Sequence, residues 1–170
     1  EEGRLHDPQL RENFIEQIFT LKRWRDTLWQ NPGTKDIVDF HSRNKLLLMA
    51  HSPEYARSMG KLMAGAAKMD QDAFRGEYEA QLIAAMRLKT TTKKHINVLQ
   101  HIMGYFKKQL SADEKQELLE TFDRFRAGHL PLLVPITLLN HYIRKYDQKY
   151  LKQQTYLNPH PIELKLRTYV

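Results

Sequence analysis

Residues 93–110 repeat apolar side chains at the spacing of an α-helix. With 3.6 residues per turn, one face of this helix is apolar and consists of Ile96, Leu99, Ile102, Met103, Phe106 and Leu110. The opposite face is polar and consists of Lys93, Asn97, Gln100, Gly104 and Lys107, flanked by Lys94, His101 and Lys108. The block therefore predicts an amphipathic helix with a basic outer face.

The same block lies inside a segment without acidic residues, which extends from Ala80 to Ala112. A solvated helix face usually mixes charges of both signs and avoids glycine, because glycine costs about 1 kcal/mol in a helix interior relative to alanine. An acid-free, basic segment favours a surface that meets an anion. Gly104 has two interpretations: it lets a phosphate or sugar approach the backbone, or it accommodates a crossing helix.

Capping and breaking residues divide the rest of the chain into further helices. The expected helices run from Pro8 to Gln30, from about Lys35 to Ala50, from Pro53 to Lys68, from Gln71 to Leu88, from Ala112 to about Gly128 and from Ile136 to Tyr146. In the first of them, the predicted apolar face consists of Leu10, Phe14, Ile18, Leu21, Trp24 and Leu28. No segment shows convincing strand alternation. We therefore expect an all-α, single-domain bundle of about seven helices with an irregular C-terminal tail.

Composition limits the classes of partner and cofactor. The chain has 170 residues, a net charge of +7 and no cysteine. The positive charge favours a nucleic acid or another polyanion as the partner. Without cysteine the chain has no disulfide, no thiolate zinc site and no cysteine-ligated iron–sulfur cluster, which suits a reducing cytoplasm. The histidines lack the spacing of helical metal ligands, and no apolar run is long enough to span a membrane. We expect a cytoplasmic protein without metal, cofactor or membrane contact.

Two further segments combine basic with polar or aromatic side chains. In the first, Arg43 and Lys45 lie between His41 and His51, and Arg43 either faces an anion or is buried in an ion pair. The second is the C-terminal tail, whose candidate binding residues are Arg144, Lys145, Lys149, Tyr150 and Tyr156. Aromatic rings next to basic side chains suit RNA loops, in which nucleobases stack on aromatic faces and phosphates contact lysine or arginine. The alternative is that the tyrosines pack against the bundle.

Four motifs in a fixed order give a resemblance to a known family. They are HSRNKLLLMAH at 41–51, NVLQHIMGYFKK at 97–108, LPLLVPITLL at 130–139, and a tail motif at 150–159. Together they resemble the YbgA-like domain family, which is catalogued as a domain of unknown function. The resemblance divides the chain into an N-terminal helix and junction at 1–39, the YbgA-like domain at 40–161, and a C-terminal tail at 162–170.

Residues 2–14 resemble the junction of two-domain relatives, in which a cysteine-containing domain comes first. Those fused proteins resemble enzymes that remove sulfur from 4-thiouridine in tRNA, with an iron–sulfur cluster in the first domain. The resemblance implies that the YbgA-like domain presents tRNA, or another structured RNA, to an upstream desulfidase domain. Because this chain has no cysteine domain, we expect it to be non-catalytic on its own.

The residues expected to bind RNA are drawn from all three segments. They are Lys93, Lys94, Asn97, Gln100, His101, Gly104, Lys107, Lys108, Arg43, Lys45, Arg144, Lys145, Lys149, Tyr150 and Tyr156. Two other functions stay open. One is a small-molecule enzyme with a pocket formed by Asn97, His101, Arg43, His51 and Tyr105. The other is a scaffold for a partner protein, which an exposed apolar patch would support.

Overall fold

The protein is all-α, as the sequence predicts. The computed structural model describes residues 2–170, and that part of the chain contains helices and turns but no strand. The α-helices are α1 (Pro8–Trp29), α2 (Thr34–His51), α3 (Pro53–Gly65), α4 (Gln71–Arg87), α5 (Thr92–Gly104), α6 (Ala112–Arg126), α7 (Leu133–Lys145) and the single turn α8 (Lys149–Lys152). Short 3-10 helices span Glu2–His6, Ala66–Lys68, Thr155–Leu157 and Ile162–Leu164.

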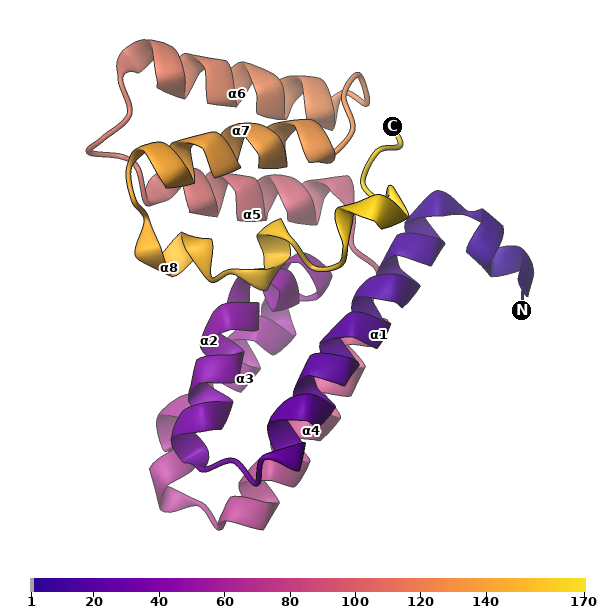
Figure 1. Ribbon diagram of the computed structural model, residues 1–170, viewed down its shortest axis with the longest axis vertical. Coiled ribbons are helices and arrows are strands. Elements are labelled where there is room, and N and C mark those ends of the chain that lie inside the picture. Colours follow the sequence, from indigo (N-terminus) through magenta and orange to yellow (C-terminus); the bar gives the residue numbers. More distant parts are fainter. Residues whose placement is uncertain (1) are drawn as a thin grey trace.

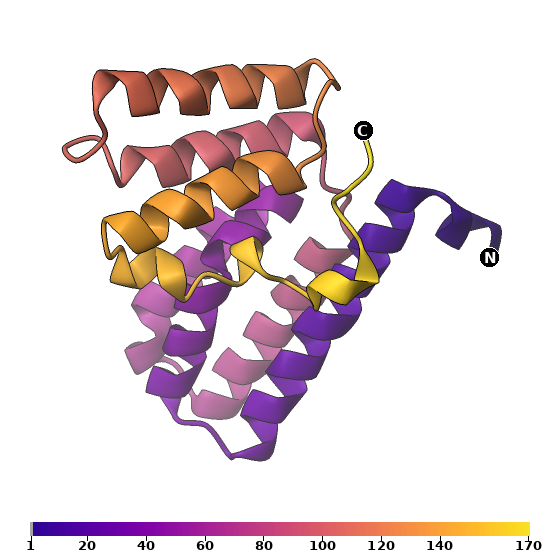
Figure 2. The same ribbon diagram turned by 45° about the horizontal axis from the view of Figure 1, so that its top comes forward.

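The helices form two groups that meet at α2 and α5 (Figure 1). In the first group α1 packs beside α4, and α2 packs beside α3. The second group is a three-helix bundle of α5, α6 and α7, in which each helix contacts the other two (Figure 2). After α8 the chain crosses between the two groups and ends near the N-terminal end of α1.

Local capping chemistry explains where several helices begin. Oδ1 of Asp7 accepts a hydrogen bond from the Leu10 amide at 2.9 Å, at the start of α1. Ser111 and Glu114 form a reciprocal capping box at the start of α6. These caps confirm the predicted helix starts, because each depends only on residues three positions apart.

Helix α5 ends earlier than the apolar pattern predicts. Its last turn tightens, with hydrogen bonds from the amides of Tyr105 and Phe106 to the carbonyl groups three residues before them, both at 3.0 Å. This turn still buries Phe106 completely. It also removes Lys107 and Lys108 from the helix and leaves them exposed in the connection to α6.

The first half of helix α1 buries a polar face, so the predicted apolar face is wrong there, whereas in its second half Trp24 is buried and Leu21 and Leu28 pack against the core as predicted. Its buried residues are Glu12, Asn13, Glu16, Thr20 and Trp24. By contrast, Phe14 and Ile18 are each 45% exposed. The reason is a partner at the far end of the chain. Arg167 in the C-terminal tail is buried and contacts the carboxylates of Glu12 and Glu16.

Candidate nucleic-acid interface

A groove runs along the surface between α2, α3 and the C-terminal end of α5. It consists of three adjoining hollows with volumes of about 520, 390 and 410 Å³. Lys45 and Gly60 line two of these hollows, and His101 and Tyr105 each join another pair. The shared residues make the three hollows one continuous surface, to which α8 adds Tyr150.

Two glycines keep the groove open. Gly60 lies in α3 and Gly104 ends α5, and a Cβ atom built on either would meet no atom within 4 Å. The crossing helix that would explain Gly104 as a packing residue is therefore not there, because the residue is exposed. The missing side chains leave room for a ligand to approach the backbone.

Aromatic rings form one wall of the groove. The rings of Tyr105 and Tyr150 stack with centroids 5.4 Å apart and an interplanar angle of 23°. His101 meets the Tyr105 ring edge-on at 5.7 Å. Burial, and then the neighbouring Tyr105 hydroxyl, raise the pKa of the Tyr150 hydroxyl to about 12. The Tyr150 hydroxyl is therefore a neutral hydrogen-bond donor at physiological pH. Tyr105 is more exposed than Tyr150, which makes its ring the available stacking surface.

The charge on the groove is positive. Lys45 and Arg57 line it, and no aspartate or glutamate does. His41, at one end, adds no charge at neutral pH because burial and then Lys45 lower its pKa to about 4. Asn97 and Gln100 contribute exposed amides that can both donate and accept hydrogen bonds. A surface with basic side chains, amides and stacked aromatic rings, and without carboxylates, is suited to binding a nucleic acid.

Residues 45–161 match the family described as "Protein of unknown function (DUF1722)". The chain belongs to this family. It is also 33% identical over 133 residues to the uncharacterized protein YbgA of Escherichia coli (strain K12), which covers 77% of this chain and 78% of the relative. No solved structure matches the chain.

The structure brings six of the predicted binding residues of this DUF1722 chain together at the groove. They are Lys45, Asn97, Gln100, His101, Gly104 and Tyr150. Lys93 is exposed in the first turn of α5, and Lys107 and Lys108 follow the groove residue Tyr105 in the chain. Arg144, in the last turn of α7, and Lys149, the first residue of α8, are exposed, although they do not line the groove.

Tyr156 is not a stacking residue, so this prediction is wrong. Its side chain is fully buried, and its hydroxyl hydrogen-bonds with Nδ1 of His95 at 3.0 Å. The guanidinium of Arg167 lies over its ring, 5.0 Å from the centroid. Tyr156 therefore holds the tail against the bundle, as the packing alternative proposed.

Two of the predicted lysines are already engaged within the protein. Nζ of Lys94 donates to the carbonyl oxygens of His51 and Lys89, both at 2.6 Å, and burial lowers its pKa. Because the His51 carbonyl belongs to the last turn of α2, Lys94 caps that helix end. Lys145 forms an ion pair with Glu114 at 2.6 Å. Neither amine is as available to a phosphate as the exposed Lys93.

The pocket expected for an enzyme does not form. Asn97, His101 and Tyr105 line the groove, but Arg43 lies on the other side of α2. His51 is fully buried, where Nε2 meets Glu16 at 2.9 Å and Nδ1 meets the Leu88 carbonyl at 2.7 Å. Arg43 is exposed and forms no ion pair with the described side chains, so its interpretation as a buried, paired side chain is also wrong.

Sequence reasoning did not find Arg57 and Gly60. Both lie in α3, and with Pro53 and Met63 they share the helix face that lines the groove. Neither belongs to a run of charge, so composition gave no signal for them. Within the described residues, no group of three histidine, aspartate or glutamate side chains is placed to hold a metal ion. No helix in that part of the chain has the length and apolar character of a membrane span.

Proposed function

We propose that this protein binds structured RNA, with tRNA as the first candidate, along the groove between α2, α3 and α5. The composition of the groove supports the proposal. Basic side chains, amides and a stacked tyrosine pair line it, and no aspartate or glutamate does. Lys45 and Arg57 bind phosphates. Tyr105 stacks on an unpaired base, and Asn97 and Gln100 hydrogen-bond to base edges or a 2′-hydroxyl.

Exposed lysine side chains around the groove extend this surface. Lys93, Lys107, Lys108 and Lys149 are all exposed, and each lies within four residues of a groove residue in the chain. A folded RNA is wide enough to meet several such positions at once. Each phosphate contact that releases counterions steepens the dependence of affinity on salt, so these lysines contribute affinity more than sequence preference.

In this proposal the chain positions RNA for a chemical step carried out by another domain. The chain has no cysteine, so it supplies no thiolate ligand for an iron–sulfur cluster. We propose that it presents tRNA, in the cytoplasm, to a cysteine-containing desulfidase domain. The groove holds the RNA backbone and an unstacked base, while the second domain reaches the sulfur.

A direct test is the binding of the full chain to bulk tRNA and to duplex DNA of matched charge, across a salt series. We expect tighter binding to tRNA, with an affinity that falls steeply as salt rises. The preference reflects unpaired bases and 2′-hydroxyl groups, which duplex DNA does not offer. Equal affinity for both nucleic acids, or no binding at low salt, would overturn the proposal.

One observation favours a protein contact as a second function. Phe14 and Ile18 lie four residues apart on the outer face of α1 and form an exposed apolar surface there. We propose that the desulfidase domain docks on this face, which leaves the groove free for RNA. If Phe14→Ser with Ile18→Ser does not weaken binding of a separately produced desulfidase domain in calorimetry, this docking face is wrong.

A further inference from the structure

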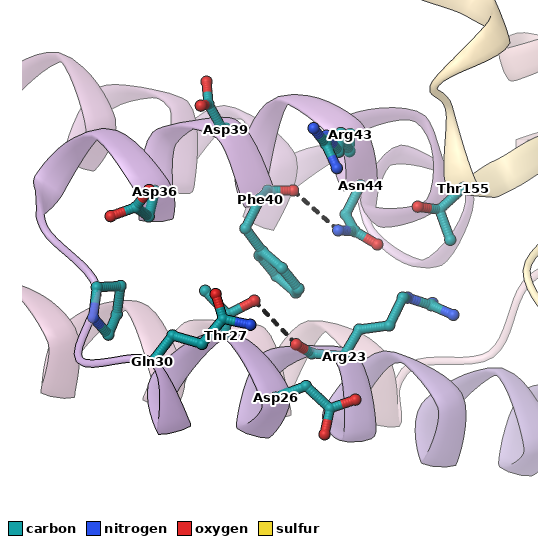
Figure 3. Close-up of a pocket in the computed structure, with 11 residues that line it drawn as sticks. Arg23, Asp26, Thr27, Gln30, Asp36, Asp39, Phe40, Arg43, Asn44 and Thr155 are labelled. Carbon is teal, nitrogen blue, oxygen red and sulfur yellow. Dashed lines mark hydrogen bonds between the residues drawn. The ribbon is translucent and has the colours of Figure 1, made fainter.

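A separate cleft lies between α1 and α2, on the side of α2 that faces away from the groove (Figure 3). Its volume is about 690 Å³, within the range of small-molecule sites. Both helices line it with polar side chains, and Thr155 from the tail closes one end. Of the predicted RNA-binding residues, Arg43 alone lines it.

Two buried polar atoms at this cleft have no hydrogen-bond partner in the described part of the chain. They are Oδ1 of Asn44 and Nε of Arg23. Asn44 is only 2% exposed, and its Nδ2 donates to the Phe40 carbonyl at 2.8 Å. That bond fixes the amide orientation, because a flipped amide would place its oxygen against the carbonyl. The unpaired oxygen therefore faces the cleft (Figure 3).

Arg23 is held so that its unpaired Nε stays in place. Its Nη1 donates to the Pro159 carbonyl and its Nη2 to the Thr20 hydroxyl, both at 2.9 Å. Buried donors and acceptors are nearly always paired in folded proteins. The unpaired donor on Arg23 and the unpaired acceptor on Asn44 belong to the lining of the same cleft, and a ligand that offers both an acceptor and a donor would satisfy them.

The charges at the mouth indicate which ligand this is. Asp39 and Arg43 stand four residues apart on α2, both exposed, and neither forms an ion pair with any side chain that the structure describes. The other two carboxylates of the cleft are engaged. Asp36 accepts from the Gly33 amide at 2.8 Å, and Asp26 pairs with Lys22 at 2.7 Å. Arg23 hydrogen-bonds only to neutral groups, so the cleft offers two guanidinium groups beside the carboxylates of Asp36 and Asp39, which make no ion pair with a described side chain. This balance of charge suits a zwitterion better than a phosphate dianion.

We propose that this cleft binds a free α-amino acid. The carboxylate of the ligand accepts hydrogen bonds from Nε of Arg23 and from Arg43. Its ammonium group donates to Asp39 and to Oδ1 of Asn44, so that one head group satisfies both unpaired atoms. The side chain of the ligand then extends toward Gln30 and Asp36, which favours a polar or cationic side chain over an acidic one.

The test is a titration of the ¹⁵N-labelled full chain, monitored by the Arg23 Nε–H and Asn44 side-chain amide resonances. The ligands are L-arginine, L-glutamine and L-glutamate, with agmatine as arginine without its carboxylate, and inorganic phosphate. We expect both resonances to shift with L-arginine and L-glutamine, at least tenfold weaker binding of L-glutamate and agmatine, and no saturable shift with phosphate.

Variants at the mouth provide the controls. Arg43→Gln and Asp39→Asn change exposed side chains that make no ion pair in the described chain, so the fold is retained. Each should weaken L-arginine at least tenfold, whereas Lys45→Glu in the separate groove should leave it unchanged. No shift at millimolar amino acid would overturn the proposal. Binding of agmatine as tight as that of L-arginine, or unaltered binding to Arg43→Gln, would also do so.

Discussion

Nη2 of Arg167 donates to Oε1 of Glu16 at 2.5 Å, across 151 positions of the sequence. Nε of the same guanidinium meets Glu12 at 3.0 Å, and Nη1 donates to the Tyr156 carbonyl. Burial alone would raise the pKa of Glu16, but Arg167 and His51 outweigh it and lower that pKa. The C-terminal tail is therefore fastened to α1 by buried charges, and it cannot leave without exposing them together.

Removal of Arg167 should destabilise the whole protein. Arg167→Leu leaves Glu12 and Glu16 buried without their cation, which in comparable buried pairs costs about 3–5 kcal/mol. The free energy of unfolding in urea measures the effect. The control is Arg126→Leu, which breaks the solvated pair with Asp123 and should cost less than about 1 kcal/mol. Similar losses in the two variants would contradict this role of Arg167.

Two buried histidines should make the protein sensitive to mild acid. Burial and then Arg167 lower the pKa of His95 to about 3, and burial and then Lys45 lower that of His41 to about 4. Both have a pKa of 6.5 when unfolded, so the unfolded chain binds these protons first. Stability is then complete above about pH 6.5 and falls between pH 6 and 4, by up to about 1.4 kcal/mol per pH unit for each histidine.

Urea unfolding at several pH values checks this dependence. His95→Gln removes one titrating group, so its free energy of unfolding should fall less steeply between pH 6 and 4 than that of the wild type. His129→Gln, at an exposed position, is the matched control and should keep the wild-type slope. Equal slopes in all three proteins would show that His95 does not carry the effect.

Substitutions of Gly60 should distinguish effects on RNA binding from effects on stability. A Cβ atom there meets nothing within 4 Å, so Gly60→Ala should stabilise α3 by up to about 1 kcal/mol through helix propensity. Gly60→Leu places a side chain in the groove and should weaken tRNA binding while the protein stays folded. Denaturation and filter binding measure the two effects. Wild-type tRNA affinity in Gly60→Leu would argue against occupation of the groove.

Adjacent lysines should have different roles. Lys94→Met removes the donor for the carbonyl oxygens of His51 and Lys89 and should cost about 1 kcal/mol of stability. Lys93→Met changes an exposed amine, so it should leave stability unaltered and lower tRNA affinity. Urea unfolding and a binding titration on both variants compare the two. Greater loss of affinity in Lys94→Met, at unaltered stability, would reverse the assignment.

Features set by residues close in sequence could be predicted. The caps at Asp7 and Ser111 involve partners three positions away, and the exposed face of α5 follows from its own periodicity. The end of α5 was missed because Phe106 remains in the core through a tightened turn, which the apolar pattern does not distinguish from a continued helix.

Features set by distant pairs could not be predicted. The buried face of α1 depends on Arg167, whose position against Glu16 is determined only when the tail folds back. The groove likewise combines α5 with Arg57 and Gly60 of α3, and no local pattern connects these helices. The polar stripe of α5 identified one wall of the candidate site, while packing supplied the other.

A pair of charge-reversal variants decides whether the groove binds RNA phosphates. Lys45→Glu changes a groove base, and Lys115→Glu makes the same change in overall charge on the exposed face of α6. The measurement is tRNA affinity across a salt series for both variants. We predict at least a tenfold loss and a shallower salt dependence for Lys45→Glu, with Lys115→Glu close to wild type. Equal tRNA affinity and equal salt dependence in the two variants would contradict phosphate binding at the groove.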